Sequence, residues 1–270
     1  MKNKIRLTVI GCGNMARAII DGLTSPASKA VLKANGDVFD ITVTDLHEKK
    51  LVPMREKCRV SIDNAAAVKD SDYVLIAVKP QQFESAVCNL SLAGKVVISI
   101  MAGVTLEKLR TVTGAGKLVR VMPNLNARVS ESMSAYCSVG LSGEEERVVL
   151  EILGSFGRFM RIDESKMDAF TGIAGSGPAF IFMAIKAFYD EAISRGFSPE
   201  LAKELTVQTF VGSALTAERH DGDFDSLVDS VCSPGGTTIE GVNYLNDNRY
   251  IDTIRAAIDR AVKRSEEMSK

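Results

Sequence analysis

A glycine-rich run near the start of the chain has the spacing of a phosphate-binding turn. Residues 11–16 read GCGNMA, a GxGxxA pattern that follows an apolar stretch and opens a helical one, Met15–Leu23. Glycine at the first two positions permits a tight turn and lets backbone N–H groups approach a pyrophosphate, whose charge the helix N-terminus stabilises. Glycine turns between a strand and a helix also occur for packing alone. The preceding strand, the following helix and the N-terminal location favour dinucleotide binding.

An aspartate ends the second predicted strand, where a carboxylate accepts hydrogen bonds from an adenosine ribose. This residue, Asp45, stands further from the glycines than the usual ~20 residues, because an insertion at about Ser25–Asp37 precedes the strand. The alternative role is a cap on a helix that begins near His47. A carboxylate here repels a 2′-phosphate, whereas His47, Lys49 and Lys50 attract one. The balance slightly favours NADH over NADPH.

Two later strand ends also carry candidate ligands of a nucleotide. Lys79 leaves a strand just before Pro80, so its side chain either points into the crevice at the carboxyl edge of the sheet or is a solvated lysine before a turn. The next strand ends at Met101-Ala102-Gly103, whose small residues let a nicotinamide lie against the backbone. Packing explains these small residues equally well.

The most informative segment is residues 231–241, VCSPGGTTIEG. A proline and two glycines before a helical segment form a loop whose successive N–H groups converge on one point, which suits an anion such as a carboxylate. Thr237 and Thr238 add hydroxyls beside it. The alternative is a tight turn between two helices that a threonine caps.

Composition excludes several other kinds of protein. The 270 residues are 46% hydrophobic and 25% charged, with 33 Lys+Arg against 34 Asp+Glu, so no global field attracts nucleic acid or an anionic membrane. The five cysteines form no CxxC pair and the two histidines stand apart, so we expect reduced thiols and no metal. The N-terminus is too short and interrupted for a signal peptide, and glycines and a proline in the uncharged run Ala169–Ile185 argue against a bilayer span. A cytoplasmic protein with a small-molecule substrate is expected.

The first half of the chain alternates short apolar runs with helical stretches, as βαβ units do. Several runs are almost continuously hydrophobic, which parallel strands covered on both faces require. The predicted strands are Ile5–Ile10, Asp40–Thr44, Tyr73–Ala77, Lys95–Ile100 and Lys117–Val121, with Ser134–Val139 and Arg158–Ile162 as later additions around a helix at about Glu144–Phe156. This pattern predicts an α/β domain, residues 1–162, with a doubly wound, Rossmann-like parallel sheet.

Beyond Ile162 the strand signal stops, and residues 163–270 are predicted to form an all-α domain. The predicted helices are Pro178–Arg195, Pro199–Arg219, Asp223–Ser230, a segment after Pro234, and Tyr250–Glu267. Apolar residues cover every direction of the first of these helices, more than a small domain buries by itself. A partner chain is expected to cover the second face, which predicts a homodimer or a multiple of dimers.

Six runs together resemble the pyrroline-5-carboxylate reductases. GCGNMARAI, AVKPQ, MAGVT, RVMPN, TGIAGSGPAF and VCSPGGTTIEG occur in this order over nearly the whole chain, and SPGGTT after GSGPA is far more specific than the glycine turn. The resemblance implies a dinucleotide domain, a helical domain that dimerises by interleaved helices, and reduction of (S)-1-pyrroline-5-carboxylate to L-proline by hydride from NAD(P)H, the last step of proline synthesis.

The resemblance also implies roles for individual residues. Those expected on the cofactor are Gly11, Cys12, Gly13, Asn14 and Met15 under the pyrophosphate, Asn64 and the turn Ala77-Val78-Lys79-Pro80, and Met101, Ala102 and Gly103 near the nicotinamide. Those expected on the substrate are Gly235, Gly236 and Thr237 at the carboxylate and Thr238, the catalytic residue, at the ring nitrogen. The chain departs from the family at Leu125-Asn126, where members commonly have Thr-Pro, and at Ser230, often Asn, Arg or Lys.

Two other functions remain open at this point. A 3-hydroxy acid or 6-phosphogluconate type of dehydrogenase needs a catalytic lysine that only Lys186 could supply, and its largely apolar helix favours a structural role. A non-catalytic dinucleotide sensor has no use for the anion-binding loop.

Overall fold

The computed structural model describes residues 3–28 and 37–269, so most of the predicted insertion Ser25–Asp37 lies outside the described residues. The chain divides into two compact units, Met1–Ser176 with Ala261–Lys270, and Gly177–Arg260. The functional division into residues 1–162 and 163–270 stays a prediction.

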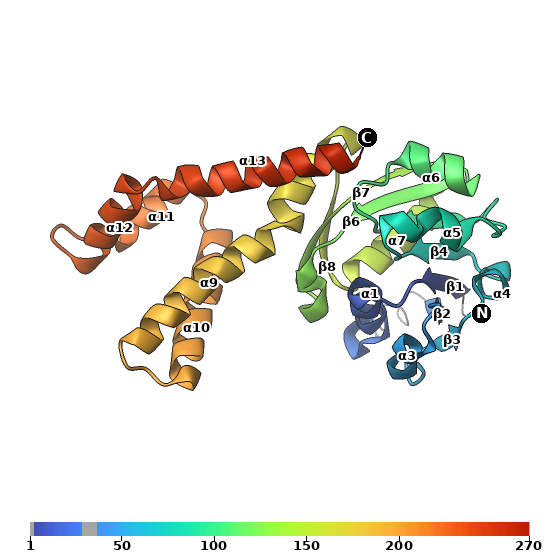
Figure 1. Cartoon of the computed structure of the whole chain (residues 1–270), viewed down its shortest axis with the longest axis horizontal. Helices are drawn as coiled ribbons and strands as arrows, with labels where there is room; N and C mark the ends of the chain where they lie inside the picture. The colour runs from blue at the N-terminus through green and yellow to red at the C-terminus, as the bar shows by residue number, and fades with distance from the viewer. Residues whose placement is uncertain (1–2, 29–36, 270) are drawn as a thin grey trace. The chain divides into compact units, whose positions relative to one another are not determined.

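The first unit contains a sheet whose order in the described residues is β3-β2-β1-β4-β5-β6-β7-β8 (Figure 1). Its strands are β1 Asn3–Ile10, β2 Asp37–Thr44, β3 Arg59–Ser61, β4 Tyr73–Ile76, β5 Val96–Ser99, β6 Lys117–Met122, β7 Ser132–Val139 and β8 Gly157–Arg161. Strands β1 to β6 are parallel to one another, β7 is antiparallel to β6, and β8 is parallel to β7. The sheet is therefore mostly parallel, with its last two strands reversed.

The reversal at β7 follows from the length of its connection. Between Met122 and Ser132 the chain forms only the short 3₁₀ helix η3, Leu125–Val129. A parallel pair needs a crossover of a dozen or more residues, usually a helix. The connection is too short for a crossover, so the chain turns back along β6.

The seven predicted strands are confirmed to within a few residues at each end, and the strand β3 is missing from the prediction. Arg59–Ser61 is three residues long, lies at the sheet edge and is only half-buried. A strand of that kind needs no continuous apolar run, so it leaves little trace in the sequence.

Helices cover both faces of this sheet. They are α1 Asn14–Thr24, α3 Glu48–Leu51, α4 Asn64–Lys69, α5 Phe83–Val87, α6 Leu106–Thr113, α7 Gly143–Gly154 and α8 Met167–Phe170, with η1 Val52–Met54, η2 Pro80–Gln82, η4 Glu164–Lys166 and the π-helical turn η5 Thr171–Gly175. Alternate residues of β1 enter two cores: Val9 packs with Ile19 of α1 and Ile152 of α7, and Ile10 packs with Phe83 of α5 and Leu109 of α6. Two cores, one on each face, confirm the doubly wound prediction.

The second unit is all-helical. Its helices are α9 Gly177–Ser194, α10 Pro199–Glu218, α11 Phe224–Val231, α12 Thr237–Asp247 and the start of α13 Tyr250–Met268, whose last turns belong to the first unit. Helices α9 and α10 form a hairpin (Figure 1) in which the rings of Phe188 and Phe210 meet edge to face at 5.2 Å.

Many apolar side chains of α9 stay exposed in the single chain. They include Ile181, Phe182, Met183 and Phe188, each at least 49% exposed. By length and composition alone, the helical run Glu164–Ser194 would suffice to cross a membrane, although the sequence predicts no span there. Either a membrane or a second copy of the chain could cover such a surface.

Candidate cofactor and substrate sites

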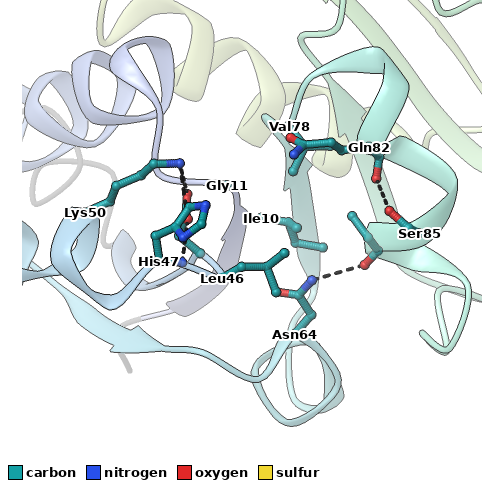
Figure 2. Close-up of a pocket in the computed structure, with 11 residues that line it drawn as sticks. Ile10, Gly11, Leu46, His47, Lys50, Asn64, Val78, Gln82 and Ser85 are labelled. Carbon is teal, nitrogen blue, oxygen red and sulfur yellow. Dashed lines mark hydrogen bonds and ion pairs between the residues drawn. The ribbon is translucent and has the colours of Figure 1, made fainter.

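A pocket of about 210 Å³ opens beside the carboxyl end of β1 (Figure 2). Gly11 lines it from the end of β1, Asp45, His47 and Lys50 from the segment after β2, and Val78 from the segment after β4. Because β2 and β4 flank β1 on opposite sides, this is the point where the strand order reverses. Doubly wound folds bind their ligands at this point.

The two glycines of the GxGxxA run differ in their surroundings. Gly11 has φ +96°, and a Cβ there would lie 2.9 Å from the carbonyl oxygen of Ala77. Gly13 is the N-cap of α1, receives no side-chain cap, and has open space where a Cβ would project. Gly11 therefore permits close packing at the end of the strand, and Gly13 leaves the start of α1 accessible. An open, uncapped start of a long helix fits a pyrophosphate.

Asp45 joins the turn after β2 to the glycine turn. One carboxylate oxygen accepts the N–H of Cys12 at 2.9 Å, the other accepts the N–H of His47 at 2.9 Å, and the ammonium of Lys50 lies 3.2 and 3.3 Å from the two oxygens. Burial raises the pKa of Asp45, but these hydrogen bonds and the charge of Lys50 together bring it below its ordinary value. Asp45 is therefore an anion at neutral pH.

The alternative role of Asp45 as a cap of the following helix is wrong. The N-cap of α3 is His47, and no side chain caps it. Asp45 instead makes a turn with the N–H two residues further along, which leaves its carboxylate on the wall of the pocket.

Asn64 and Val78 line the same pocket, as a cofactor contact requires. The Asn64 amide donates to the carbonyl of Ala86 at 3.1 Å, which ties α4 to the end of α5 (Figure 2). The N–H of Ala77 donates a hydrogen bond to the carbonyl of Ile10 at 2.8 Å. Lys79 precedes η2 with an exposed side chain that has no hydrogen bond or ion pair to the rest of the described chain.

Pro80 lies apart from this pocket, in a second hollow of about 870 Å³ that Ala102 and Gly103 also line. Met101 is 3% exposed and packs in the core. Gly103 has φ +73°, and a Cβ there would lie 2.7 Å from the carbonyl oxygen of Met268. Close packing thus requires the glycine at 103, independently of any contact between this segment and a nicotinamide.

The loop between α11 and α12 has the features of an anion site within the helical unit. Gly235 has φ +68°, and Gly236, the N-cap of α12, donates its N–H to the carbonyl of Ser233 at 2.9 Å. No side chain caps α12, so the alternative of a threonine-capped turn is wrong. Neither Thr237 nor Thr238 makes a side-chain hydrogen bond to any described residue, and both hydroxyls are available to a ligand.

Some pocket residues escape sequence reasoning. Gln82 and Ser85 line the pocket from η2 and α5, where the Ser85 hydroxyl donates to the Gln82 carbonyl at 3.0 Å (Figure 2). The available signal is Pro80, a proline that begins a helical turn just after a buried strand. In the described part of the chain, no group of three or more His, Cys, Asp or Glu residues is placed to hold a metal.

Known proteins match both halves of the chain. Residues 164–268 match the family model described as pyrroline-5-carboxylate reductase dimerisation, and residues 6–103 match the model described as NADP oxidoreductase coenzyme F420-dependent. A pyrroline-5-carboxylate reductase of Methanosarcina acetivorans is 38% identical over 280 residues and covers 100% of both chains. One from Aquifex aeolicus is 36% identical over 267 residues, 98% of this chain and 97% of the relative.

A solved structure shows the same likeness. Plasmodium falciparum pyrroline carboxylate reductase with NADP bound has a TM-score of 0.87 to this chain, 30% sequence identity, and coverage of 100% of both chains. That protein is an NADP-bound member of the same fold, and its likeness extends over both compact units.

Proposed function

The chain belongs to the pyrroline-5-carboxylate reductase family, and we propose that it reduces (S)-1-pyrroline-5-carboxylate to L-proline with hydride from NAD(P)H, the last step of proline biosynthesis. The observation that carries this function is the similarity to reductases over the entire chain, at 38% identity for the Methanosarcina acetivorans relative. The chain is therefore an NAD(P)H-dependent oxidoreductase, and neither a hydroxy acid dehydrogenase nor a sensor is favoured.

The residues of the first unit fit the cofactor. The open start of α1 at Gly13 supports a pyrophosphate site over Gly11, Cys12, Gly13, Asn14 and Met15. Asp45, Asn64 and Val78 are walls of one pocket, which supports their contact with the adenosine half. When bound, NAD(P)H supplies the hydride, and the protein holds the cofactor in place and excludes water.

The loop after α11 is proposed to hold the substrate. Pyrroline-5-carboxylate has a carboxylate and a ring nitrogen a few atoms apart. The N–H groups of Gly235 and Thr237 make no hydrogen bond to the described chain and suit the carboxylate, beside Gly236, whose own N–H is bound to Ser233. The free Thr238 hydroxyl suits the nitrogen. A cyclic imine is protonated near neutral pH, so Thr238 needs only to orient the nitrogen and need not act as a strong acid.

The helical region supports self-association. Its match to a dimerisation model indicates a homo-oligomer. We further propose that the oligomer is a dimer or a multiple of dimers, in which a second copy covers the exposed apolar residues of α9. The formal net charge of −1 supports a cytoplasmic protein with no nucleic-acid or membrane partner, in which Glu164–Ser194 serves association.

NADH and NADPH absorbance with added pyrroline-5-carboxylate tests the function. We expect oxidation of the cofactor that depends on this substrate, with proline as the product. Cofactor binding without turnover would indicate a sensor, and NAD(P)⁺ reduction by 3-hydroxy acids or 6-phosphogluconate would indicate another dehydrogenase. Either outcome would overturn the proposal.

A further inference from the structure

The pocket wall proposed for the adenosine end of the cofactor contains an ion pair whose two members differ in exposure and in their other hydrogen bonds. The Asp45 side chain is 9% exposed and receives two backbone N–H groups, whereas the Lys50 side chain is 46% exposed. If the ammonium moves away, the carboxylate keeps the N–H groups of Cys12 and His47. Lys50 is therefore the member of the pair that can change partners.

The backbone of Lys50 is held by hydrogen bonds to its carbonyl, whereas its exposed ammonium is held by the pair with Asp45. Its carbonyl accepts a hydrogen bond from Arg17 of α1 at 2.9 Å and another from the thiol of Cys12 at 3.3 Å. Both donors lie in or beside the glycine turn. The base of the lysine side chain thus stays at a constant place on the pocket wall, and its flexible stem carries the charge.

The charges decide which nucleotide this wall accepts. A lone carboxylate at the end of β2 favours a ribose 2′-hydroxyl and repels a 2′-phosphate. Here Lys50 cancels that charge, and His47 lines the same wall. The Asp45–Lys50 pair has no net charge before a nucleotide binds, and it contains a cation able to contact a phosphate.

We propose that Lys50 is the specificity-determining residue that admits NADPH, by moving its ammonium from Asp45 to the 2′-phosphate. With NADH the pair stays closed and Asp45 faces the ribose. The two states allow one pocket to take either cofactor. This inference rests on the proposed function only in requiring a dinucleotide in the pocket.

Titration calorimetry with 5′-AMP and 2′,5′-ADP, with no substrate present, tests the proposal. We expect the parent to bind 2′,5′-ADP more tightly than 5′-AMP. Lys50→Met should lower the affinity for 2′,5′-ADP about 10- to 100-fold, because it removes a hydrogen bond to a charged group. Its affinity for 5′-AMP should stay within about twofold of the parent.

Lys49→Met is the matched control, since Lys49 is the preceding residue of α3 and is not on the pocket wall. It removes the same charge from the same helix, so it should change both affinities by no more than about twofold. Lys50→Arg keeps the cation and should restore most of the preference for 2′,5′-ADP. Unchanged melting temperatures would show that the variants fold.

Three outcomes would overturn the proposal: a parent that does not prefer 2′,5′-ADP, a Lys50→Met variant that loses both nucleotides equally, or a Lys49→Met variant with the same loss as Lys50→Met. The last result would indicate that the two lysines act through the general electrostatic field of the helix, with no direct contact between Lys50 and the 2′-phosphate. Because substrate is absent, failure of the chain to reduce pyrroline-5-carboxylate would contradict the proposed function and leave this test intact.

Discussion

The hydroxyl of Ser265 donates a hydrogen bond to the carboxylate of Asp168 at 2.6 Å and so joins residues 97 positions apart. The hydroxyl of Ser269 reaches the same oxygen at 2.8 Å. One turn away, Met268 packs against Gly103 so closely that a Cβ at 103 would lie 2.7 Å from its carbonyl oxygen. The end of α13 is thus docked beside the segment after β5, which the family resemblance assigns to the nicotinamide side.

Replacing Asp168 should loosen this end of α13. Asp168→Ala removes the acceptor of two hydroxyls, one of them on the buried Ser265, and should lower the free energy of unfolding of the parent by about 1–3 kcal/mol in urea. Asp168→Asn keeps an oxygen acceptor and should lose less. As a control, Asp21→Ala breaks only a surface ion pair with Lys57 and should cost about 0–1 kcal/mol. Equal losses in the two alanine variants would contradict a docking role.

The two glycines of the cofactor turn should respond differently to alanine. Gly13→Ala projects a methyl group into open space, so the fold should persist while NADH and NADPH lose about tenfold or more in affinity, because the methyl group takes the space proposed for the pyrophosphate. Gly11→Ala should instead destabilise the fold, since φ is +96° and the methyl group meets Ala77. Thermal melts and fluorescence titration with NADH separate the two effects. Undiminished cofactor binding by a folded Gly13→Ala variant would remove Gly13 from the pyrophosphate site.

A charge on α9 should weaken self-association. Met183 is 72% exposed in the single chain, and Met183→Glu should raise the dimer dissociation constant about 10- to 100-fold if a second copy buries it. Arg128→Glu, an exposed site in the first unit, is the control and should leave association unchanged. Light scattering over a dilution series measures both. A folded parent that stays monomeric at all concentrations would contradict the proposed oligomer.

The sequence predicts the architecture well wherever burial leaves a pattern. Tyr73–Ile76 is completely buried, and its run of apolar residues identifies a strand covered on both faces. The edge strand Arg59–Ser61 is half-buried and has no such run, so it escapes prediction. The direction of β7 depends on the length of the turn after β6 and on pairing with it, which hydrophobic periodicity does not report.

The candidate site is predictable in its residues and less so in its contacts. Glycine spacing and strand ends lead to Gly11 and Asp45, and the family resemblance adds Asn64; all three line one pocket. That Asp45 bonds to the N–H of Cys12 depends on two loops meeting across parallel strands, a tertiary relationship that spacing does not reveal. At Ser230 the chain departs from the family, and the serine hydroxyl donates a hydrogen bond to the carbonyl of Leu227 in its own helix at 2.7 Å.

Acid should weaken the start of α7 through Glu145. Burial raises the pKa of this carboxyl, but Lys117 and the N–H of Ser142 bring it below its ordinary value of 4.5. Because folding lowers the pKa, the ionised group stabilises the chain above about pH 4.5, and this contribution is lost as the pH falls through the folded-state value.

Glu145→Gln keeps an acceptor for Ser142 and loses the charge, so it should cost about 0.5–1 kcal/mol at pH 7 and progressively less below pH 4.5. Urea unfolding at a series of pH values measures the difference from the parent. The exposed neighbour Glu144, as Glu144→Gln, is the control for removing a charge from the same helix turn. A cost that does not change with pH would show that the charge of Glu145 contributes nothing.

Thr238 should matter for the reaction through its hydroxyl. Thr238→Val keeps the shape and removes the donor, and loss of one preorganised donor to a reacting group can cost about 10²–10³-fold in rate. We expect less here, about 10- to 100-fold in kcat/KM for pyrroline-5-carboxylate, because the imine can be protonated by solvent and water can fill the vacated place. Thr238→Ser keeps the hydroxyl and should recover most of the activity, while the dissociation constant for NADH barely moves in either variant. Since Gly236 and not Thr238 is the N-cap of α12, loss of a cap cannot explain a defect in the valine variant. If a folded Thr238→Val enzyme keeps a kcat/KM within about twofold of the parent, the lost hydroxyl cannot have contacted the reacting group. That result would show that another group serves the ring nitrogen.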